Sequence, residues 1–273
     1  MPADLTAATS LTSRVDDADG RGRWTTELDP RWQGNFGFFG GYVAAILTRA
    51  LATVGSASGQ APLSVSVSFL ERPEPGDAEV ATTVERAGSL LTSVSAALVQ
   101  GSRQVARAHG AVAAPRQGPA FVDRPMPQVA PPRDCAPWRP DEWHDLPILD
   151  RYELRAALNG EPFAGADVVE TAGWARLTEP TALDASLVAF LADAFMPPIM
   201  GRETRRLIAP TIELQLTFQV PLPADPGPDA WYLSHLSSEF AAGGYLEQSG
   251  TVWSQDGQLL ARMRHLNLVR YVE

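Results

Sequence analysis

The stretch that decides the fold is Leu63-Ser-Val-Ser-Val-Ser-Phe69, in which apolar and polar residues alternate without a break. Strict alternation predicts a strand with one face toward a core and the other toward solvent. The pattern returns about 150 residues later, in Thr211-Ile-Glu-Leu-Gln-Leu-Thr-Phe218. Each run ends shortly before a proline, Pro73 or Pro221, which is typical of a strand end. The two halves of the chain therefore carry matching strands.

A predicted helix precedes each of these strands. Residues 40–54 place apolar side chains at helical spacing and stop at Gly55, as an amphipathic helix does. Residues 183–195 repeat this apolar stripe. Thr181 with an acid three places later resembles a capping box at the start, and Pro197 marks the end. Each half thus has a long helix followed by strands.

Tight turns and a proline-rich joint complete the predicted organisation. Gln100-Gly101 and Asp256-Gly257 separate further strands in the two halves. A helix with one apolar face must bury it against a sheet, so two copies of one α+β unit explain the order of signals. Prolines crowd residues 115–143, which disfavours helix and central strand there. We therefore expect a first repeat, a connector and a second repeat over residues 1–114, 115–145 and 146–273.

Composition excludes several classes of protein. The 273 residues carry a formal net charge of −10, which argues against a nucleic-acid binder, because such proteins need a basic surface. All 22 basic residues are Arg, so chemistry that needs a lysine is excluded, and we expect no cofactor. The single Cys135 allows no intrachain disulfide, and the 4 His lack metal-ligand spacing. No stretch predicts a signal peptide or a membrane span, so we expect a cytoplasmic protein.

Several stretches resemble one known family. They are Phe39-Gly40-Gly41-Tyr42, Leu191-Ala192-Asp193, the run from Thr211 to Phe218, and Asp256-Gly257. In this order and spacing they resemble the type II acyl-CoA thioesterases, which are double hot-dog proteins. The resemblance covers roughly residues 24–113 and 167–270. It implies an α+β fold of two tandem repeats, each with a long helix wrapped by an antiparallel sheet.

The resemblance also implies a catalytic site that activates a water molecule. In that family the water is held by an Asp of the second helix, a Thr or Ser at the start of the next strand, and a Gln of the last strand. The matching positions here are Asp193, Thr211 and His265. His265 departs from the family pattern, because an imidazole directs its hydrogen bonds differently from an amide and can change its protonation.

The residues themselves predict a site composed from both halves. Asp193 is an acid in an apolar helix, where burial would raise its pKa; a place on the polar edge of the helix is the alternative. Gly40 and Gly41 begin the first helix, where glycines let a substrate approach and free N–H groups favour an oxyanion. A tight entry to the helix is the alternative there. The second helix has Asp184-Ala185 instead, and the first has Thr48 where the acid would fall. With the two helices placed as in a pair of hot-dog units, which the resemblance implies, we predict that Gly41 faces Asp193.

Other candidates concern substrate binding. Phe39, Gly40 and Tyr42 are expected to border an apolar tunnel for the acyl chain, unless the two rings belong to the core. The densest basic cluster is expected to bind a phosphate of coenzyme A, which would enter as part of the substrate, unless the cluster is simply solvated. This cluster comprises Arg202, Arg205 and Arg206.

Three functions fit these features. We expect a hydrolase that cleaves acyl-CoA or related acyl thioesters. A hot-dog hydratase or dehydratase would need a close His–Asp pair, and a non-catalytic acyl-thioester-binding protein would explain why His265 replaces the family Gln. We expect no metal, no nucleic-acid partner and no membrane insertion. A homodimer is expected because hot-dog sheets pair readily.

Overall fold

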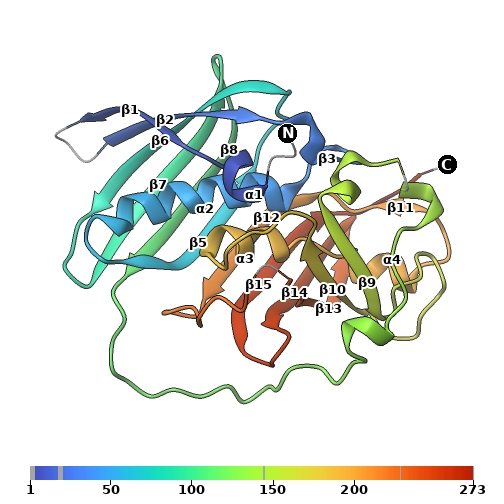
Figure 1. Cartoon of the computed structure of the whole chain (residues 1–273). Coiled ribbons are helices and arrows are strands. Elements are labelled where there is room, and N and C mark those ends of the chain that lie inside the picture. The colour runs from blue at the N-terminus through green and yellow to red at the C-terminus, as the bar shows by residue number, and fades with distance from the viewer. Residues whose placement is uncertain (1–3, 18–20, 144, 228, 273) are drawn as a thin grey trace.

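The computed structural model describes residues 4–17, 21–143, 145–227 and 229–272. Its main feature is a twelve-stranded antiparallel sheet (Figure 1). In spatial order its strands are β1 (Thr12–Asp17), β2 (Arg21–Leu28), β6 (Gly76–Arg86), β7 (Leu91–Gln100), β8 (Arg103–Ala113), β5 (Ala61–Phe69), β12 (Thr211–Phe218), β15 (Leu259–Leu268), β14 (Tyr245–Ser254), β13 (Tyr232–Ala242), β10 (Glu170–Leu177) and β9 (Tyr152–Leu158). Two short pairs lie outside it: β3 (Gln33–Gly34) with β4 (Gly37–Phe38), and β11 (Leu207–Ile208) with β16 (Arg270–Tyr271).

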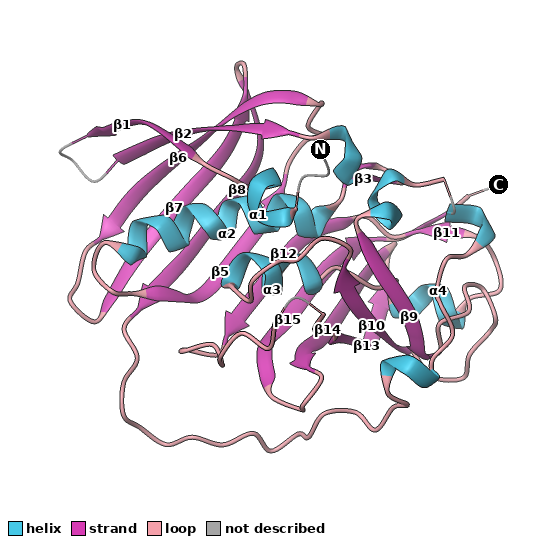
Figure 2. Ribbon diagram, viewed as in Figure 1, coloured by secondary structure: helices cyan, strands magenta, loops and turns pink. Residues whose placement is uncertain are grey.

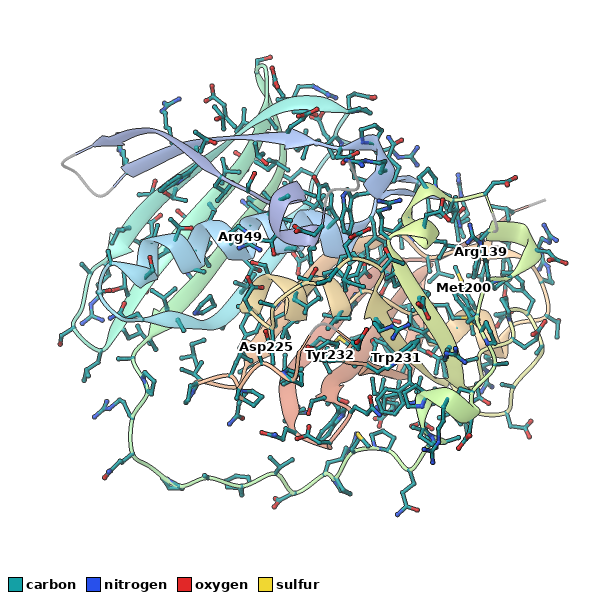
Figure 3. The ribbon with its side chains drawn as sticks, viewed as in Figure 1. Arg49, Arg139, Met200, Asp225, Trp231 and Tyr232 are labelled. Carbon is teal, nitrogen blue, oxygen red and sulfur yellow. The ribbon has the colours of Figure 1, made fainter. Side chains whose placement is uncertain are left out.

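Two helices lie side by side on one face of this sheet (Figure 2). They are α2 (Gly40–Ser56) and the much shorter α3 (Ala185–Leu191). Arg49 of α2, labelled in Figure 3, forms an ion pair with Asp184, the N-cap residue of α3. Arg49 Nη2 and Asp184 Oδ2 lie 3.2 Å apart. The other described helical turns are α1 (Leu5–Ala8), α4 (Pro198–Arg202), and 3-10 turns at Pro30–Trp32, Pro132–Asp134, Asp141–Trp143 and Pro147–Asp150.

The halves of the sheet join at β5 and β12, the two strands with the alternating pattern. The strands pair antiparallel, with Val67 opposite Leu214 and Val65 opposite Leu216. All four of these side chains are buried, because alternate residues of a strand point to the same face. The two half-sheets therefore share one apolar core across the seam between β5 and β12.

The second helix differs from the prediction. The prediction of a long helix over residues 183–195 is wrong, since α3 ends at Leu191. Its N-cap is Asp184 rather than Thr181: the Asp184 side chain accepts a hydrogen bond from the N–H of Leu187 at 2.8 Å. Among the described residues, a long helix is thus present in the first half and not in the second.

Backbone hydrogen bonds explain why α3 is short. The N–H groups of Asp193 and Ala194 donate to the carbonyls of Phe190 and Leu191, three residues back instead of four. This tighter spacing is that of a 3-10 turn, which commonly ends an α-helix. Pro197 then prevents the helix from continuing. Asp193 consequently stands in a turn after the helix.

The proline-rich connector covers a second, smaller apolar cluster. Residues 114–131 contain no helix or strand. Met126 and Val129 pack on a cluster that is separate from the main core, and Trp174 of this cluster donates from Nε1 to the carbonyl of Ala130 at 2.8 Å. The connector therefore shields apolar side chains of the second half; the cluster comprises Cys135, Ala172, Trp174, Leu233 and Trp253.

Candidate active site

A cavity of about 480 Å³ lies where the two halves meet, and both halves and the connector contribute to its walls. The walls are largely apolar and rich in aromatic rings. Asp193 and Thr211 are among the polar residues that line the cavity. A few polar side chains in a largely apolar space are typical of a small-molecule site. The aromatic residues of the lining include Phe36, Phe38, Phe39, Trp138, Tyr152 and Phe195.

Asp193 connects the two halves. Its Oδ2 accepts a hydrogen bond from the N–H of Gly41 at 2.8 Å, so the predicted meeting of these two residues is present. The carboxylate thus lies at the N-terminus of α2, where the helix dipole favours negative charge. The Asp193 side chain is 19% exposed and lines the cavity. The alternative position, on the polar edge of a helix, is therefore wrong.

The two glycines make room for the second half rather than for a substrate. A Cβ on Gly40 would lie 2.7 Å from Asp193 Oδ2, and a Cβ on Gly41 would lie 2.5 Å from the carbonyl oxygen of Phe190. Both distances are too short for real Cβ atoms. The N–H of Gly41 is also occupied by the carboxylate, which corrects the expectation that it faces an oxyanion. The N–H of Gly40 makes no hydrogen bond within the described residues, and Gly40 lines the cavity.

Burial controls the protonation of Asp193. It raises the pKa of the carboxyl group from 3.8 to about 7, and the hydrogen bond from Gly41 partly opposes this rise because it stabilises the charged form. The carboxyl group therefore gains and loses its proton near neutral pH, as a general base should. A strongly perturbed acid in a cavity is a candidate for function.

His265 of β15 lies next to Asp193 but outside the described cavity lining. Its side chain is 1% exposed, with Nδ1 3.9 Å from Asp193 Oδ1 and Nε2 3.2 Å from the carbonyl oxygen of Ala192. A carbonyl oxygen can only accept, so Nε2 carries the hydrogen and Nδ1 presents a lone pair to Asp193. Burial lowers the pKa of His265 to about 4, which keeps the ring neutral at pH 7. His265 is not among the described residues that line the cavity.

Thr211 lies at the start of β12, and its hydroxyl oxygen accepts a hydrogen bond from Asn267 of β15. Asn267 lies opposite Thr211 in the register of β12 and β15. Its Nδ2 donates to Thr211 Oγ1 at 3.1 Å and to the carbonyl oxygen of Ala209 at 2.9 Å. Asn267 was not a sequence-based candidate. The available signal was a polar residue two positions after His265, which places both on the same face of one strand.

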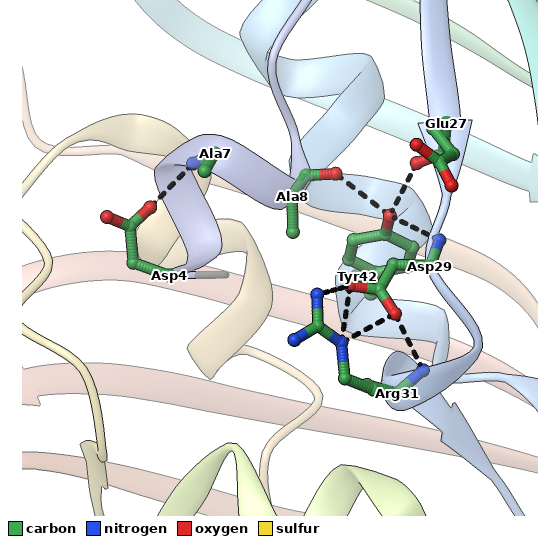
Figure 4. A network of polar contacts seen from close by, with 7 residues as sticks. All are labelled: Asp4, Ala7, Ala8, Glu27, Asp29, Arg31 and Tyr42. Carbon is green, nitrogen blue, oxygen red and sulfur yellow. Dashed lines mark hydrogen bonds and ion pairs between the residues drawn. The ribbon is translucent and has the colours of Figure 1, made fainter. Parts of the chain in front are cut away.

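Tyr42 belongs to the core, and Figure 4 shows the polar contacts of its hydroxyl. Its ring stacks on Trp32 with centroids 5.2 Å apart, and its hydroxyl donates to the carbonyl oxygen of Ala8 at 2.9 Å. Because Tyr42 is fully buried and is not among the described cavity residues, its predicted role in substrate binding is wrong. Phe39 does line the cavity, with its ring 5.3 Å from that of Phe190.

The predicted basic cluster is not part of the described cavity lining. Arg202 donates to a backbone carbonyl at 3.0 Å, and Arg205 lies over the ring of Tyr271 at 4.1 Å. These two residues and Arg206 are exposed, and phosphate binding by them stays a prediction. The cavity is instead lined by Arg72, which has no basic neighbour in the sequence and therefore formed no recognisable cluster.

Neither a cluster of metal ligands nor a membrane-spanning helix occurs among the described residues. These contain no group of three or more His, Cys, Asp and Glu side chains that could hold a metal ion. None of the helices described is both long and apolar enough to cross a membrane.

The sheet, its two helices and the cavity between the halves define a protein of the hot-dog class. Models of the acyl-CoA thioesterase family match the chain over residues 28–113, for the N-terminal domain, and 132–269, for the C-terminal domain. The chain therefore belongs to the acyl-CoA thioesterase family.

Similar proteins agree with this assignment of fold. A conserved protein of unknown function with a hot dog fold from Alicyclobacillus acidocaldarius has a TM-score of 0.84 and 25% identity, over 98% of each chain. An acyl-CoA thioesterase II from Mycobacterium marinum has a TM-score of 0.72 and 18% identity, over 98% of this chain and 99% of that one. An uncharacterized protein of Mycobacterium tuberculosis is 25% identical, with 89% of each chain covered.

Proposed function

We propose that the protein hydrolyses acyl-CoA thioesters and that Asp193 activates the attacking water. The observation that carries this proposal is the largely apolar cavity lined by Asp193, a carboxyl group whose pKa is about 7 and which accepts a hydrogen bond at the N-terminus of α2. Membership of the family supports the class of reaction. The apolar walls suit a fatty acyl group or a related one. Coenzyme A takes part as the leaving group of the substrate and not as a separate cofactor.

In the proposed reaction Asp193 takes a proton from water while the water oxygen attacks the carbonyl carbon of the thioester. Thr211 holds this water. Negative charge then develops on the carbonyl oxygen, and the N–H of Gly40 at the helix N-terminus is available to stabilise it. When the intermediate collapses, the C–S bond breaks and Asp193 returns the proton to the departing sulfur. The products are a carboxylic acid and a free thiol.

His265 acts on Asp193 and not on the substrate in this proposal. Its Nδ1 lone pair faces Asp193 Oδ1 at 3.9 Å, so it can accept a hydrogen bond from the protonated acid. A movement of about 1 Å would bring the two atoms within hydrogen-bond distance. The imidazole thereby stabilises the proton that Asp193 has taken from water, whereas the Gln of related thioesterases holds the water itself.

Two other functions were open from the sequence. A hydratase needs a histidine that reaches the substrate carbon, and His265 is 1% exposed behind Asp193, so their proximity does not favour that chemistry. A non-catalytic acyl-thioester-binding protein stays the second candidate, because such a protein would retain the cavity without the family Gln. The arrangement as two tandem hot-dog repeats, the homodimer and the cytoplasmic location also stay proposals.

Release of free thiol from acyl-CoAs of increasing chain length tests the proposed function. The wild type should hydrolyse at least one chain length, and Asp193→Asn should lower kcat by about 10²-fold or more, because an amide cannot take the proton. Asp184→Asn is the matched control: Asp184 is an acid that caps α3 outside the described cavity lining. Unchanged turnover in Asp193→Asn would contradict the mechanism, and absence of turnover on every chain length would favour the binding protein.

A further inference from the structure

Asn267 is a buried amide whose single structural hydrogen bond to the backbone does not account for all of its polar groups. At the end of β15 the outward side chains Leu266 and Leu268 are apolar and exposed, while the inward side chains His265 and Asn267 are polar and buried. A buried amide is unfavourable unless its hydrogen bonds are made. Asn267 Oδ1 has no partner within the described residues, so the hydrogen-bonding capacity of this amide is only partly used by the fold.

The hydrogen-bond partners of Asn267 determine which way its side-chain amide is oriented. The carbonyl oxygen of Ala209 can only accept, so the Asn267 atom 2.9 Å away from it must be Nδ2. The second N–H of the same group then points to Thr211 Oγ1, at 3.1 Å. The Thr211 oxygen accepts this bond and keeps its own hydrogen for another partner. No described residue accepts that hydrogen, and Thr211 lines the cavity together with Asp193.

We propose that Asn267 is a positioning residue that makes the Thr211 hydroxyl a hydrogen-bond donor toward the cavity. This inference rests on the proposed function and deepens it. A water that accepts from Thr211 can still donate a hydrogen to Asp193 and direct its second lone pair at the thioester carbon. Without Asn267 the Thr211 hydroxyl can rotate and accept from the same water, which turns the water hydrogen away from Asp193.

A double-mutant cycle tests this role through kcat. Asn267→Leu and Thr211→Val should each lower kcat about tenfold or more, with a much smaller change in KM. The double variant should be no slower than Thr211→Val, because Asn267 acts only through the hydroxyl. If the two losses multiply instead, the inference is wrong.

A second buried amide provides a matched control. Gln60 donates from Nε2 to a backbone carbonyl at 2.8 Å and has an unpartnered Oε1, as Asn267 does, but it is not among the described cavity residues. Gln60→Leu should therefore leave kcat unchanged. An equal fall of kcat in Gln60→Leu and Asn267→Leu would mean that loss of a buried amide acts through the core, and this would overturn the inference.

Neutron diffraction from crystals exchanged into D2O gives a test that needs no enzymatic activity. The two deuterons of Asn267 Nδ2 should lie toward the carbonyl oxygen of Ala209 and toward Thr211 Oγ1. The deuteron of Thr211 should point into the cavity, and a Thr211 deuteron directed at Asn267 would overturn the inference. Should the wild type hydrolyse no acyl-CoA, the proposed function fails while this measurement still decides the role of Asn267.

Discussion

The buried pair of Asp193 and His265 leads to a quantitative prediction about stability and pH. In the folded protein the carboxyl group keeps its proton up to about pH 7, and the imidazole stays neutral down to about pH 4. In the unfolded chain the carboxyl group loses its proton near 3.8 and the imidazole gains one near 6.5. Between about pH 4 and 6.5 the pair therefore binds one proton in both states.

The two contributions to the free energy of unfolding consequently cancel in this pH range. The raised pKa of Asp193 makes stability fall as pH rises, because the folded state binds more protons; the lowered pKa of His265 makes stability rise with pH. Each group can change the free energy of unfolding by at most about 1.4 kcal/mol per pH unit. From 3.8 to about 7 the ceiling for Asp193 is about 4 kcal/mol. About half of this is expected, since 19% of the side chain is exposed to solvent in the cavity.

Two substitutions separate the contributions of Asp193 and His265 to the pH dependence of the free energy of unfolding. Relative to wild type, Asp193→Asn should gain stability as pH rises, and His265→Gln should lose stability, by about 0.7–1.4 kcal/mol per pH unit in each case. Urea denaturation at several pH values between about 4.5 and 6.5 measures both, and the other titrating groups cancel in the differences. Parallel stability curves for wild type and Asp193→Asn would refute the assignment of a raised pKa to Asp193.

Three further outcomes are expected. The value of kcat/KM should rise with pH through about 7, since Asp193 must be ionised to accept a proton; a flat profile across that pH would exclude it as the base. Gly40→Ala should lower kcat about 10²-fold in steady-state assays, because the new Cβ would meet Asp193 Oδ2 at 2.7 Å, and an unaltered kcat would show that the carboxylate is not so tightly placed. Tyr42→Phe should destabilise the fold by about 1–2 kcal/mol in urea titrations with KM unchanged, because its hydroxyl bonds to Ala8 in the core; a raised KM would return Tyr42 to the substrate site.

Local patterns predicted the parts of the fold that short stretches determine. The alternating run predicted β12 with its observed bounds Thr211–Phe218, and Gly40 begins α2 as expected. The meeting of Gly41 and Asp193 was predictable because each half lacks the group that the other supplies and because the family resemblance implied how the two helices are placed. Such complementarity can be recognised in a sequence when two halves are compared position by position.

Contacts between distant segments could not be predicted in this way. The hydroxyl of Tyr42 bonds to backbone carbonyls of Ala8 and Glu27, and no local pattern marks that destination. The apolar residues after Leu191 remain buried although the helix has ended, so helical spacing alone extended α3 too far. The contact of Asn267 with Thr211 depends on the strand register at a bulge, which only the folded sheet defines.

The seam between β5 and β12 places two unlike halves in one polypeptide. In an assembly of identical subunits every mutation appears in each subunit. A residue that suits one role would therefore also occupy the equivalent position in every other subunit. Here α2 begins with Gly40, whereas α3 begins with Ala185 and is capped by Asp184. Within one polypeptide the two halves can differ, and here one supplies the backbone amide of Gly41 and the other the acid Asp193.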